Sequence, residues 1–258
     1  MTEDLQERQI EIKLETKFDY HEFLDQHLIT DCILVVDGQE VQAHRVILAN
    51  SSSFFDNIFT SGMTEDITKK VDIIKNPENV FSLVLRWMYT GSLQFPKEKI
   101  HAIIEVAKIY GVNALLELLE NYLSKLFEEP LEANKDFINE VYEKRYPDGT
   151  KYENTLSIVA KHLAQYLPEC AHSNEKLKIM SDLVDCKAWG IALSHYTADN
   201  DQKKDLEKKI NLTLEFLNST NDYKLTKQDV DNLKIGFEGL PNNTKIEKFY
   251  NELYNKCE

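Results

Sequence analysis

The sequence has few of the residues that mark several common classes of protein. Only 4 of its 258 residues are cysteines, and none forms a CxxC pair or stands beside a histidine at metal-ligand spacing. Such sparse cysteines do not make a disulfide framework and argue against a structural zinc site. Cys32 lies in an apolar run and is expected to act as a small buried hydrophobic residue.

Long hydrophobic runs are also missing. No stretch approaches 18 consecutive apolar residues, so no membrane-spanning segment is predicted. The first residues, MTEDLQERQIEIKLE, are charged and lack the apolar core of a secretory signal. We therefore expect a soluble cytoplasmic or nuclear protein. No Lys/Arg-rich run distinguishes the two compartments.

Positive charge is scarce relative to negative charge. The chain carries 30 basic and 44 acidic residues, a net charge of -14, and the acidity is spread over both halves. Such a surface repels phosphate groups, so neither nucleic acid nor an anionic membrane is an expected direct partner. The alternative explanation of the negative net charge is that it keeps the protein soluble. Hydrophobic residues make up 42% of the chain, a globular composition sufficient for one large domain or two small ones.

The motifs of common catalytic sites are absent. The sequence has no GxSxG, no HExxH, no GxGxxG and no Gly-rich phosphate loop. Its 7 histidines show no partner ligand at helical spacing, and adjacent carboxylates such as Glu65 and Asp66 fall in polar loops. We predict no catalytic, cofactor-binding or metal-binding residue and no cofactor, and expect a protein without enzymatic activity. An enzyme of an unfamiliar type is a third hypothesis.

The first half alternates short strands and helices. Asp37-Gly38 is a strong hairpin turn between an apolar strand and a short alternating one, since glycine accepts positive φ without strain. Asn76-Pro77 is typical of a helix start. The strands are expected at 10–14, 32–36, 39–43 and 71–74, and the helices at 19–28, from 44, from 53 to Gly62, from 76 to Gly91, from 96 to Gly111 and at 113–129.

The second half has no strand signal. Pro130 marks the expected boundary, because proline punctuates regular structure. Helical patterns follow at 134–145, 151–167, 174–196, 201–218, 226–235 and 243–256. This half is therefore expected to be all-α.

The order of these features resembles a BTB/POZ domain. The resemblance covers roughly residues 18–127 and rests on Asp31, Ala43-His44-Arg45, Phe54-Phe55, Tyr89-Thr90-Gly91 and Tyr110-Gly111-Val112. It implies an α+β BTB/POZ domain at 10–128, a small mixed sheet packed with helices, followed by an all-α, BACK-like domain at 129–258. Kelch-like repeats and zinc fingers are absent from this sequence.

The resemblance also implies self-association. Asp31 and Arg45 would form a charged pair near the floor of a homodimer, with Phe23 and Leu24 on the first helix. Ile10 and Ile12 would add a strand to the partner's sheet. The alternatives are that Asp31 only starts a strand, that Arg45 is solvated, and that the first strand stays within its own chain. His44 is expected to be a hydrogen-bonded structural residue rather than a metal ligand.

A second implied surface would contact a cullin-3-type scaffold. Family members that bind this scaffold carry an apolar residue, any residue and then Glu after the corresponding helix, and Met63-Thr64-Glu65 fits that pattern. Phe55, Asp56 and Tyr110 would line the same surface. The alternative is an ordinary loop whose methionine packs on its own core.

Together these features predict a homodimeric, non-enzymatic adaptor. It would place an unknown protein substrate beside a cullin-3 RING ubiquitin ligase. The alternative is an oligomerisation or regulatory scaffold, such as a transcription co-regulator, without a link to a ligase.

Overall fold

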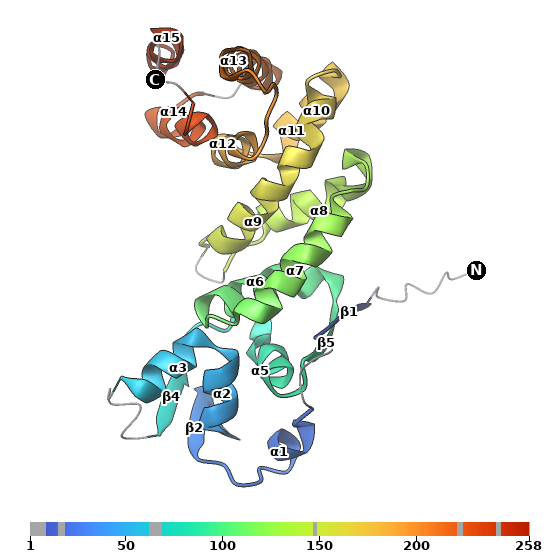
Figure 1. Ribbon diagram of the computed structural model, residues 1–258, viewed down its shortest axis with the longest axis vertical. Coiled ribbons are helices and arrows are strands. Elements are labelled where there is room, and N and C mark those ends of the chain that lie inside the picture. Colours follow the sequence, from blue (N-terminus) through green and yellow to red (C-terminus); the bar gives the residue numbers. More distant parts are fainter. Residues whose placement is uncertain are drawn as a thin grey trace, which may run out of the picture. The chain divides into compact units, whose positions relative to one another are not determined.

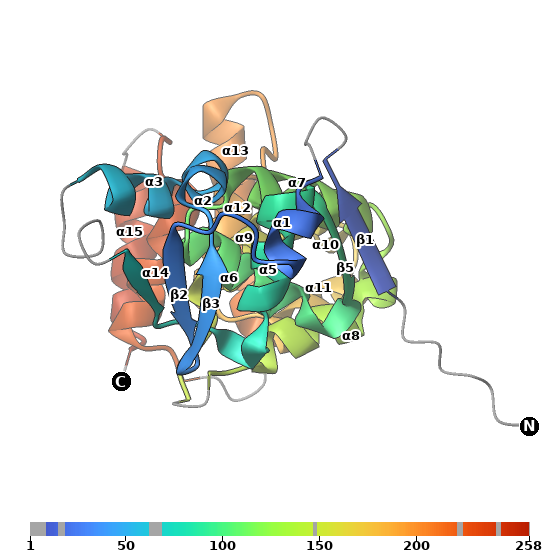
Figure 2. The same ribbon diagram turned by 90° about the horizontal axis from the view of Figure 1, so that it is seen from below.

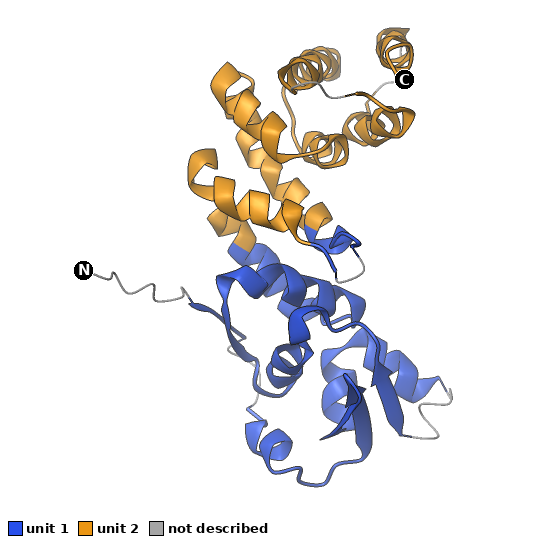
Figure 3. Ribbon diagram, turned by 180° about the vertical axis from the view of Figure 1, so that it is seen from behind, with its two compact units in different colours: residues 1–122, 145–155 blue, residues 123–144, 156–258 orange. Residues whose placement is uncertain are grey.

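The computed structural model describes residues 9–14, 19–61, 69–146, 149–220, 224–240 and 244–257. The chain forms two compact units, residues 1–122 with 145–155 and residues 123–144 with 156–258 (Figure 3). A short segment that follows the first helix of the second unit therefore belongs to the first unit.

The first unit contains a mixed three-stranded sheet with the order β3-β2-β4 (Figure 2). Its strands are β2 (Cys32–Val36), β3 (Gln39–Ala43) and β4 (Lys70–Ile73). β2 and β3 are antiparallel and joined by Asp37 and Gly38, whose φ values of 50° and 79° suit a tight hairpin turn. β4 runs parallel to β2, so the predicted hairpin and the third strand are both confirmed.

A separate two-stranded sheet pairs the first strand with a later one. β1 (Gln9–Lys13) runs antiparallel to β5 (Ser92–Pro96). Its alternating pattern places Ile10 opposite Phe95 and Ile12 opposite Leu93, and all four side chains are buried. The alternation of exposed and buried side chains along β1 follows from the two-residue period of a strand.

Helices pack around these strands (Figure 1). They are α1 (His21–Asp25), α2 (Arg45–Ser51), α3 (Ser53–Thr60), α5 (Phe81–Thr90), α6 (Ile100–Ile109) and α7 (Asn113–Leu126), with short 3-10 turns η1 (Pro77–Asn79) and η2 (Lys97–Lys99). The Ser52 hydroxyl caps α3 by accepting from the Phe55 N–H at 3.2 Å. Gly91, at φ 69°, ends α5 in the left-handed conformation.

The helix expected from Asn76 to Gly91 is interrupted. Glu78 and Asn79 have φ values of 52° and 56°, which no α-helix tolerates. The Asn76 side chain reaches past them and accepts from the Phe81 N–H at 2.7 Å. Asn76 therefore caps α5 itself, and the intervening residues form η1.

The second unit is helical, as predicted. Its helices are α8 (Leu131–Glu143), α9 (Glu153–Leu163), α10 (Leu167–Cys170), α11 (Asn174–Leu183), α12 (Cys186–Ser194), α13 (Gln202–Ser219), α14 (Lys227–Lys234) and α15 (Thr244–Tyr254), with η3 (Ala164–Tyr166) and η4 (Ile235–Phe237). The single helix expected over 174–196 is two helices. Val184 is extended and ends α11. The Asp185 carboxylate then caps the start of α12 by accepting from the Ala188 N–H at 2.9 Å.

Candidate interaction surface

Exposed apolar side chains of the described residues gather on one part of the first unit. The large exposed hydrophobic residues are Tyr20, Phe23, Leu28, Ile29, Val46 and Ile74. All except Ile74 come from α1, the residue before it, the α1–β2 connection or the start of α2. Ile29 is 86% exposed and Val46 is 74% exposed. We call Tyr20, Phe23, Leu28, Ile29 and Val46 the apolar face.

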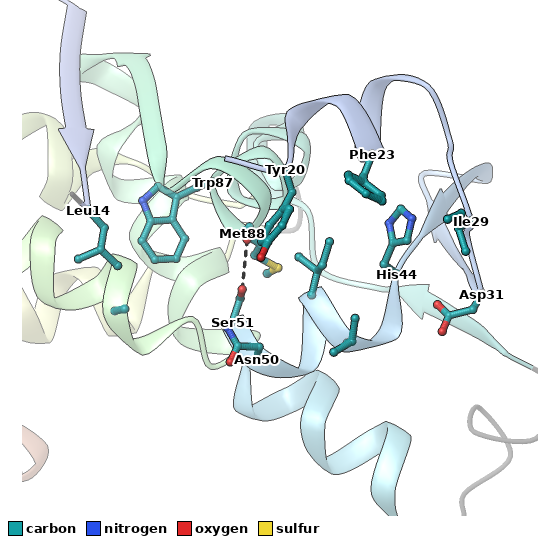
Figure 4. A pocket seen from close by; sticks show the side chains of 13 residues that line it. Leu14, Tyr20, Phe23, Ile29, Asp31, His44, Asn50, Ser51, Trp87 and Met88 are labelled. Atoms are coloured by element: carbon teal, nitrogen blue, oxygen red, sulfur yellow. Dashed lines mark hydrogen bonds between the residues drawn. The ribbon is translucent and has the colours of Figure 1, made fainter. Parts of the chain in front are cut away.

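A pocket of about 790 Å³ lies beside this face (Figure 4). Leu14, Trp87 and Met88 line one end, and Phe23, Ile29 and His44 line the other. The Ser51 hydroxyl donates to the Met88 carbonyl at 3.2 Å and ties α2 to α5 beneath the pocket. The face is therefore a hollowed apolar surface rather than scattered single residues, which is the pattern of a protein interaction site.

Hydrogen bonds from Tyr89 and His44 hold the loop that carries Ile29. The Tyr89 hydroxyl accepts from the His44 backbone N–H at 2.9 Å and lies 2.8 Å from His44 Nδ1. The other ring nitrogen, Nε2, contacts the Leu28 carbonyl. Because a carbonyl oxygen only accepts, Nε2 donates to Leu28, and Nδ1 shares a hydrogen bond with the Tyr89 hydroxyl. His44 is the hydrogen-bonded structural residue that the sequence predicts.

Burial keeps the Tyr89 hydroxyl in its donor form. Desolvation in the core raises the pKa of Tyr89 well above its usual range. The phenol therefore retains its proton beside His44. The Cys32 thiol on the neighbouring strand is also desolvated, which raises its pKa to about 12 and leaves it unreactive.

Replacing Tyr89 with phenylalanine is expected to destabilise the protein by about 1–3 kcal/mol, because two buried His44 groups lose their partner. Urea denaturation measures the change. Tyr122→Phe is the matched control, since no hydrogen bond of the Tyr122 hydroxyl occurs in the described part of the chain. Equal stability of the two variants would contradict a supporting role for Tyr89.

The backbone at Ile29 is strained. Its φ of 55° places a β-branched residue in the left-handed region, which costs roughly 1–2 kcal/mol. Its side chain is also almost fully exposed, so the isolated chain gains no burial from it. Neither backbone preference nor solvation favours isoleucine here. A contact outside the chain would give this side chain a role.

Asp31 and Arg45 meet through the main chain. Asp31 Oδ1 accepts from the backbone N–H of Arg45 at 2.7 Å, which satisfies a first-turn donor of α2. The Arg45 guanidinium donates to the Phe59 carbonyl at 2.9 Å and lies 4.9 Å from the centre of the Phe59 ring. The expected contact between carboxylate and guanidinium is not among those of the described residues. Asp31 is exposed and Arg45 is half-buried.

The other residues expected at a dimer interface lie in different settings. Phe23 belongs to the apolar face, and its ring meets His44 edge-on at 5.8 Å. Leu24 is half-buried on α1. Ile10 and Ile12 are buried, and their strand pairs with β5 of the same chain in this structure.

The surface expected to contact a scaffold is built on α3. Phe55 is fully buried and Tyr110 nearly so, with their rings stacked at 6.3 Å between centres. The Tyr110 hydroxyl accepts from the Lys75 N–H at 3.0 Å and donates to the Lys75 carbonyl. Both aromatic residues therefore support the surface from within, while Asp56 is exposed on it. Met63 and Glu65 lie outside the described residues.

Sequence reasoning missed four residues of the apolar face, Tyr20, Leu28, Ile29 and Val46. Tyr20, Ile29 and Val46 have no periodic pattern that separates them from core residues, and Val46 belongs to an apolar helix start. Their exposure depends on where α1 and α2 lie against the sheet, which is tertiary information. The left-handed backbone at Ile29 has no sequence signal, since isoleucine disfavours it.

No group of three or more His, Cys, Asp and Glu side chains in the described ranges is arranged to hold a metal ion. Among the helices described, none is long and apolar enough to cross a membrane.

Comparisons with known proteins agree with the fold of the first unit. Residues 20–126 match the BTB/POZ domain. The chain is 28% identical over 167 residues, 63% of its length, to human Kelch repeat and BTB domain-containing protein 4, and the match covers 30% of that protein. It is 30% identical to human Kelch repeat and BTB domain-containing protein 2 over 40% of this chain, and 26% identical to Kelch-like protein 40 of Xenopus laevis over the same share. The matches cover 16% and 17% of those two relatives.

Proposed function

Because residues 20–126 of this chain form a BTB/POZ domain, we propose that it is a non-enzymatic adaptor that self-associates through the apolar face. The observation that carries the proposal is the grouping of exposed hydrophobic side chains around one pocket, with Ile29 86% and Val46 74% exposed. An apolar patch of this kind marks a surface that associates. The domain would extend over 10–128, followed by a BACK-like helical domain at 129–258.

A second copy of the chain is the proposed occupant of the apolar face. In a two-fold dimer the same patch meets itself, so an apolar surface on one copy is automatically complementary in polarity to its partner. Asp31 and Arg45 border this region, and Asp31 lines the pocket. Polar groups at the border of an apolar centre are the usual composition of such interfaces. Phe23 and Leu24 on α1 would contribute to the contact.

We also propose that α3 and the loop after it bind a cullin-3-type scaffold. Asp56 is exposed on α3, and Phe55, Phe59 and Tyr110 form a stacked aromatic base beneath it. Rigid aromatic packing under an interaction helix fixes its position before binding and lowers the entropy cost of association. Met63 would fill an apolar pocket of the scaffold, and Glu65 would set specificity at its rim.

Met63→Ala/Glu65→Ala is expected to abolish retention of purified cullin-3 by the immobilised full-length chain. The double variant removes the apolar anchor and the acidic group together, a loss of more than tenfold in affinity. The pull-down compares it with wild type and with Ile74→Ala, an exposed apolar residue of the same unit that lies beyond β4. Absence of cullin-3 binding by the wild type would remove the ligase link. The apolar face would then support a regulatory oligomerisation scaffold instead.

The chain spans 30% or less of the length of the relatives described above. A substrate surface is therefore not transferred from them. We propose that an unidentified protein substrate binds the helical half. In the described part of that half no large hydrophobic side chain is exposed, so this contact would rely on polar groups.

A further inference from the structure

The first unit has a second pocket, of about 590 Å³, apart from the apolar face. It is lined by Asp37 of the β2–β3 turn, by residues 74–79, and by Arg145, Tyr146 and Tyr152. All of these residues belong to the first unit, and none of them lines the pocket beside the apolar face. A cavity of this volume can hold a small ligand or a few side chains of a peptide.

A deeply buried tyrosine forms part of the wall of this pocket. Tyr152 is only 1% exposed, and its ring stacks on Tyr146 at 4.3 Å and meets the His101 ring edge-on at 5.0 Å. Within the part of the chain that the structure describes, its hydroxyl has no hydrogen-bond partner. A buried hydroxyl without a partner costs free energy, and phenylalanine would give the same ring contacts without that cost. The hydroxyl of Tyr152 therefore calls for a partner outside the chain.

The carboxylates of the pocket wall already have partners. Asp37 Oδ2 accepts from Asn76 Nδ2 at 2.6 Å, and Glu78 Oε1 lies 2.7 Å from His101 Nε2. The remaining side-chain oxygen of Asn76 accepts from the Phe81 N–H at 2.7 Å. These contacts use the acceptor groups of the wall within the protein itself. The polar groups that remain for a ligand are therefore chiefly donors.

Two cations and one phenol supply these donors. The Lys75 amine lies 5.3 Å from the centre of the Tyr146 ring, and no carboxylate pairs with it in the described ranges. The Tyr110 hydroxyl bonds both the N–H and the carbonyl of Lys75, which fixes the backbone that carries this amine. Arg145 is a second exposed cation of the same wall. Burial, with a smaller contribution from the nearby Glu78, raises the pKa of Tyr152 to about 12, so its hydroxyl keeps the proton that it can donate.

This set of donors fits a carboxylate that is attached to an apolar body. Hydrogen bonds from a cation to a carboxylate are among the strongest in proteins, and a carboxylate has enough lone pairs for several donors. The tyrosine rings and the buried Pro77 offer an apolar floor. Ile74 also lines the pocket and is 84% exposed, so an occupant can extend along it beyond the cavity. An acidic side chain within a peptide has both the charge and the neighbouring apolar groups for such a site.

We propose that this pocket binds an acidic side chain of a partner peptide, whose carboxylate accepts from the Tyr152 hydroxyl and pairs with Lys75 and Arg145. An apolar residue next to it in the peptide would pack on Ile74. The site needs neither the apolar face nor the loop after α3, so its failure and the failure of self-association or scaffold binding are separate results. The carboxylate at the end of a peptide has the same chemistry, and the experiment distinguishes it from a side chain.

Titration of the full-length chain, labelled with ¹³C on its tyrosine rings and followed by NMR, tests the proposal. The probes are acetyl-Leu-Glu-Leu-amide, its glutamine analogue, and the glutamine analogue with a free C-terminal carboxylate. We expect the glutamate probe to bind about tenfold or more tightly than both others and to shift the Tyr152 signal, which its absence from Tyr152→Phe identifies. Tyr152→Phe and Lys75→Met should each weaken the glutamate probe by about tenfold. Lys108→Met, an exposed change on α6 outside the pocket, is the matched control and should bind like wild type.

Thermal unfolding separates a ligand contact from a structural role of the same hydroxyl. Tyr152→Phe should unfold at or above the wild-type temperature, because it removes a buried hydroxyl that has no partner in the described chain. Weaker probe binding with unchanged stability is the supporting result. A clear loss of stability would show that the hydroxyl serves the fold, and equal binding of the glutamate and glutamine probes would exclude a carboxylate site. Preference for the free C-terminus would overturn the assignment to an acidic side chain.

Discussion

Replacing Val46 with aspartate is expected to convert the dimer into monomers. Val46 is 74% exposed in the single chain, so the substitution removes little packing within it. In a symmetric dimer the same change occurs twice, and each lost valine contact is worth about 1.5–3 kcal/mol before the cost of burying a carboxylate is added. The dissociation constant is therefore expected to rise by more than about a hundredfold. Light scattering at micromolar concentration measures the change.

The monomer should not lose stability in this variant. Val46 lies in the first turn of α2, where a negative charge interacts favourably with the helix dipole. Thermal unfolding of Val46→Asp under monomeric conditions is therefore expected at or slightly above that of the wild-type monomer. Ile74→Asp is the matched control, since Ile74 is 84% exposed in the same unit but lies away from the apolar face. It should remain dimeric.

Ile29→Asn provides an independent test of the same face. Asparagine accepts the left-handed backbone more readily than isoleucine, so the monomer should gain up to about 1 kcal/mol. The dimer should nevertheless weaken, because an exposed apolar side chain leaves the contact. A variant with a more stable monomer and a weaker dimer would show that Ile29 serves the interface rather than the folding of the chain. A wild-type protein that is monomeric at micromolar concentration would refute the proposed contact through this face.

The strands and turns of the first unit could be predicted because local chemistry decides them. Asp37-Gly38 permits few structures other than a tight turn, and the alternation of Ile10 and Ile12 gives a one-sided strand. Interruptions of helices were harder to foresee. Val184 and Asp185 sit within a hydrophobic period that continues across them, and the break becomes visible only when Asp185 caps a new helix.

The structural role of a residue could be predicted where the family resemblance and its local hydrogen bonds agree. It was harder to predict where burial in the folded chain decides the role. His44 fulfils the structural role predicted for it. Phe55 lies on α3 and Tyr110 follows α6, both at positions whose burial the sequence leaves ambiguous, and packing turns both inward. Glu105, a buried carboxylate in the apolar helix α6, could not be explained from the sequence. Nothing in the sequence near it indicates the N–H groups of Asn154 and Thr155 that donate to it. They lie about fifty residues later in the chain, at a contact that only tertiary structure creates.

Replacing Gly190 with alanine is expected to destabilise the helical unit by about 2 kcal/mol, roughly 5 °C in Tm. Gly190 lies in α12 where that helix meets α14, and a Cβ there would stand 2.3 Å from the Asn232 carbonyl oxygen. This oxygen belongs to a helix backbone and cannot rotate away, so α14 must shift. Alanine improves intrinsic helix propensity by about 1 kcal/mol, but overpacking at so close an approach costs about 3 kcal/mol and outweighs it. Thermal and urea denaturation measure the difference.

Ser194→Ala separates the two opposing effects. Ser194 is exposed at the end of the same helix, so alanine there adds helix propensity without a clash. Its stability should equal or slightly exceed that of wild type, while Gly190→Ala falls below it. The packing near Gly190 reinforces this expectation, because Gly236 makes a similar close approach, with a hypothetical Cβ 2.8 Å from Leu193 Cδ2. A Gly190→Ala protein more stable than wild type would mean that α12 and α14 separate readily, and that the close helix contact does not determine the stability of this unit.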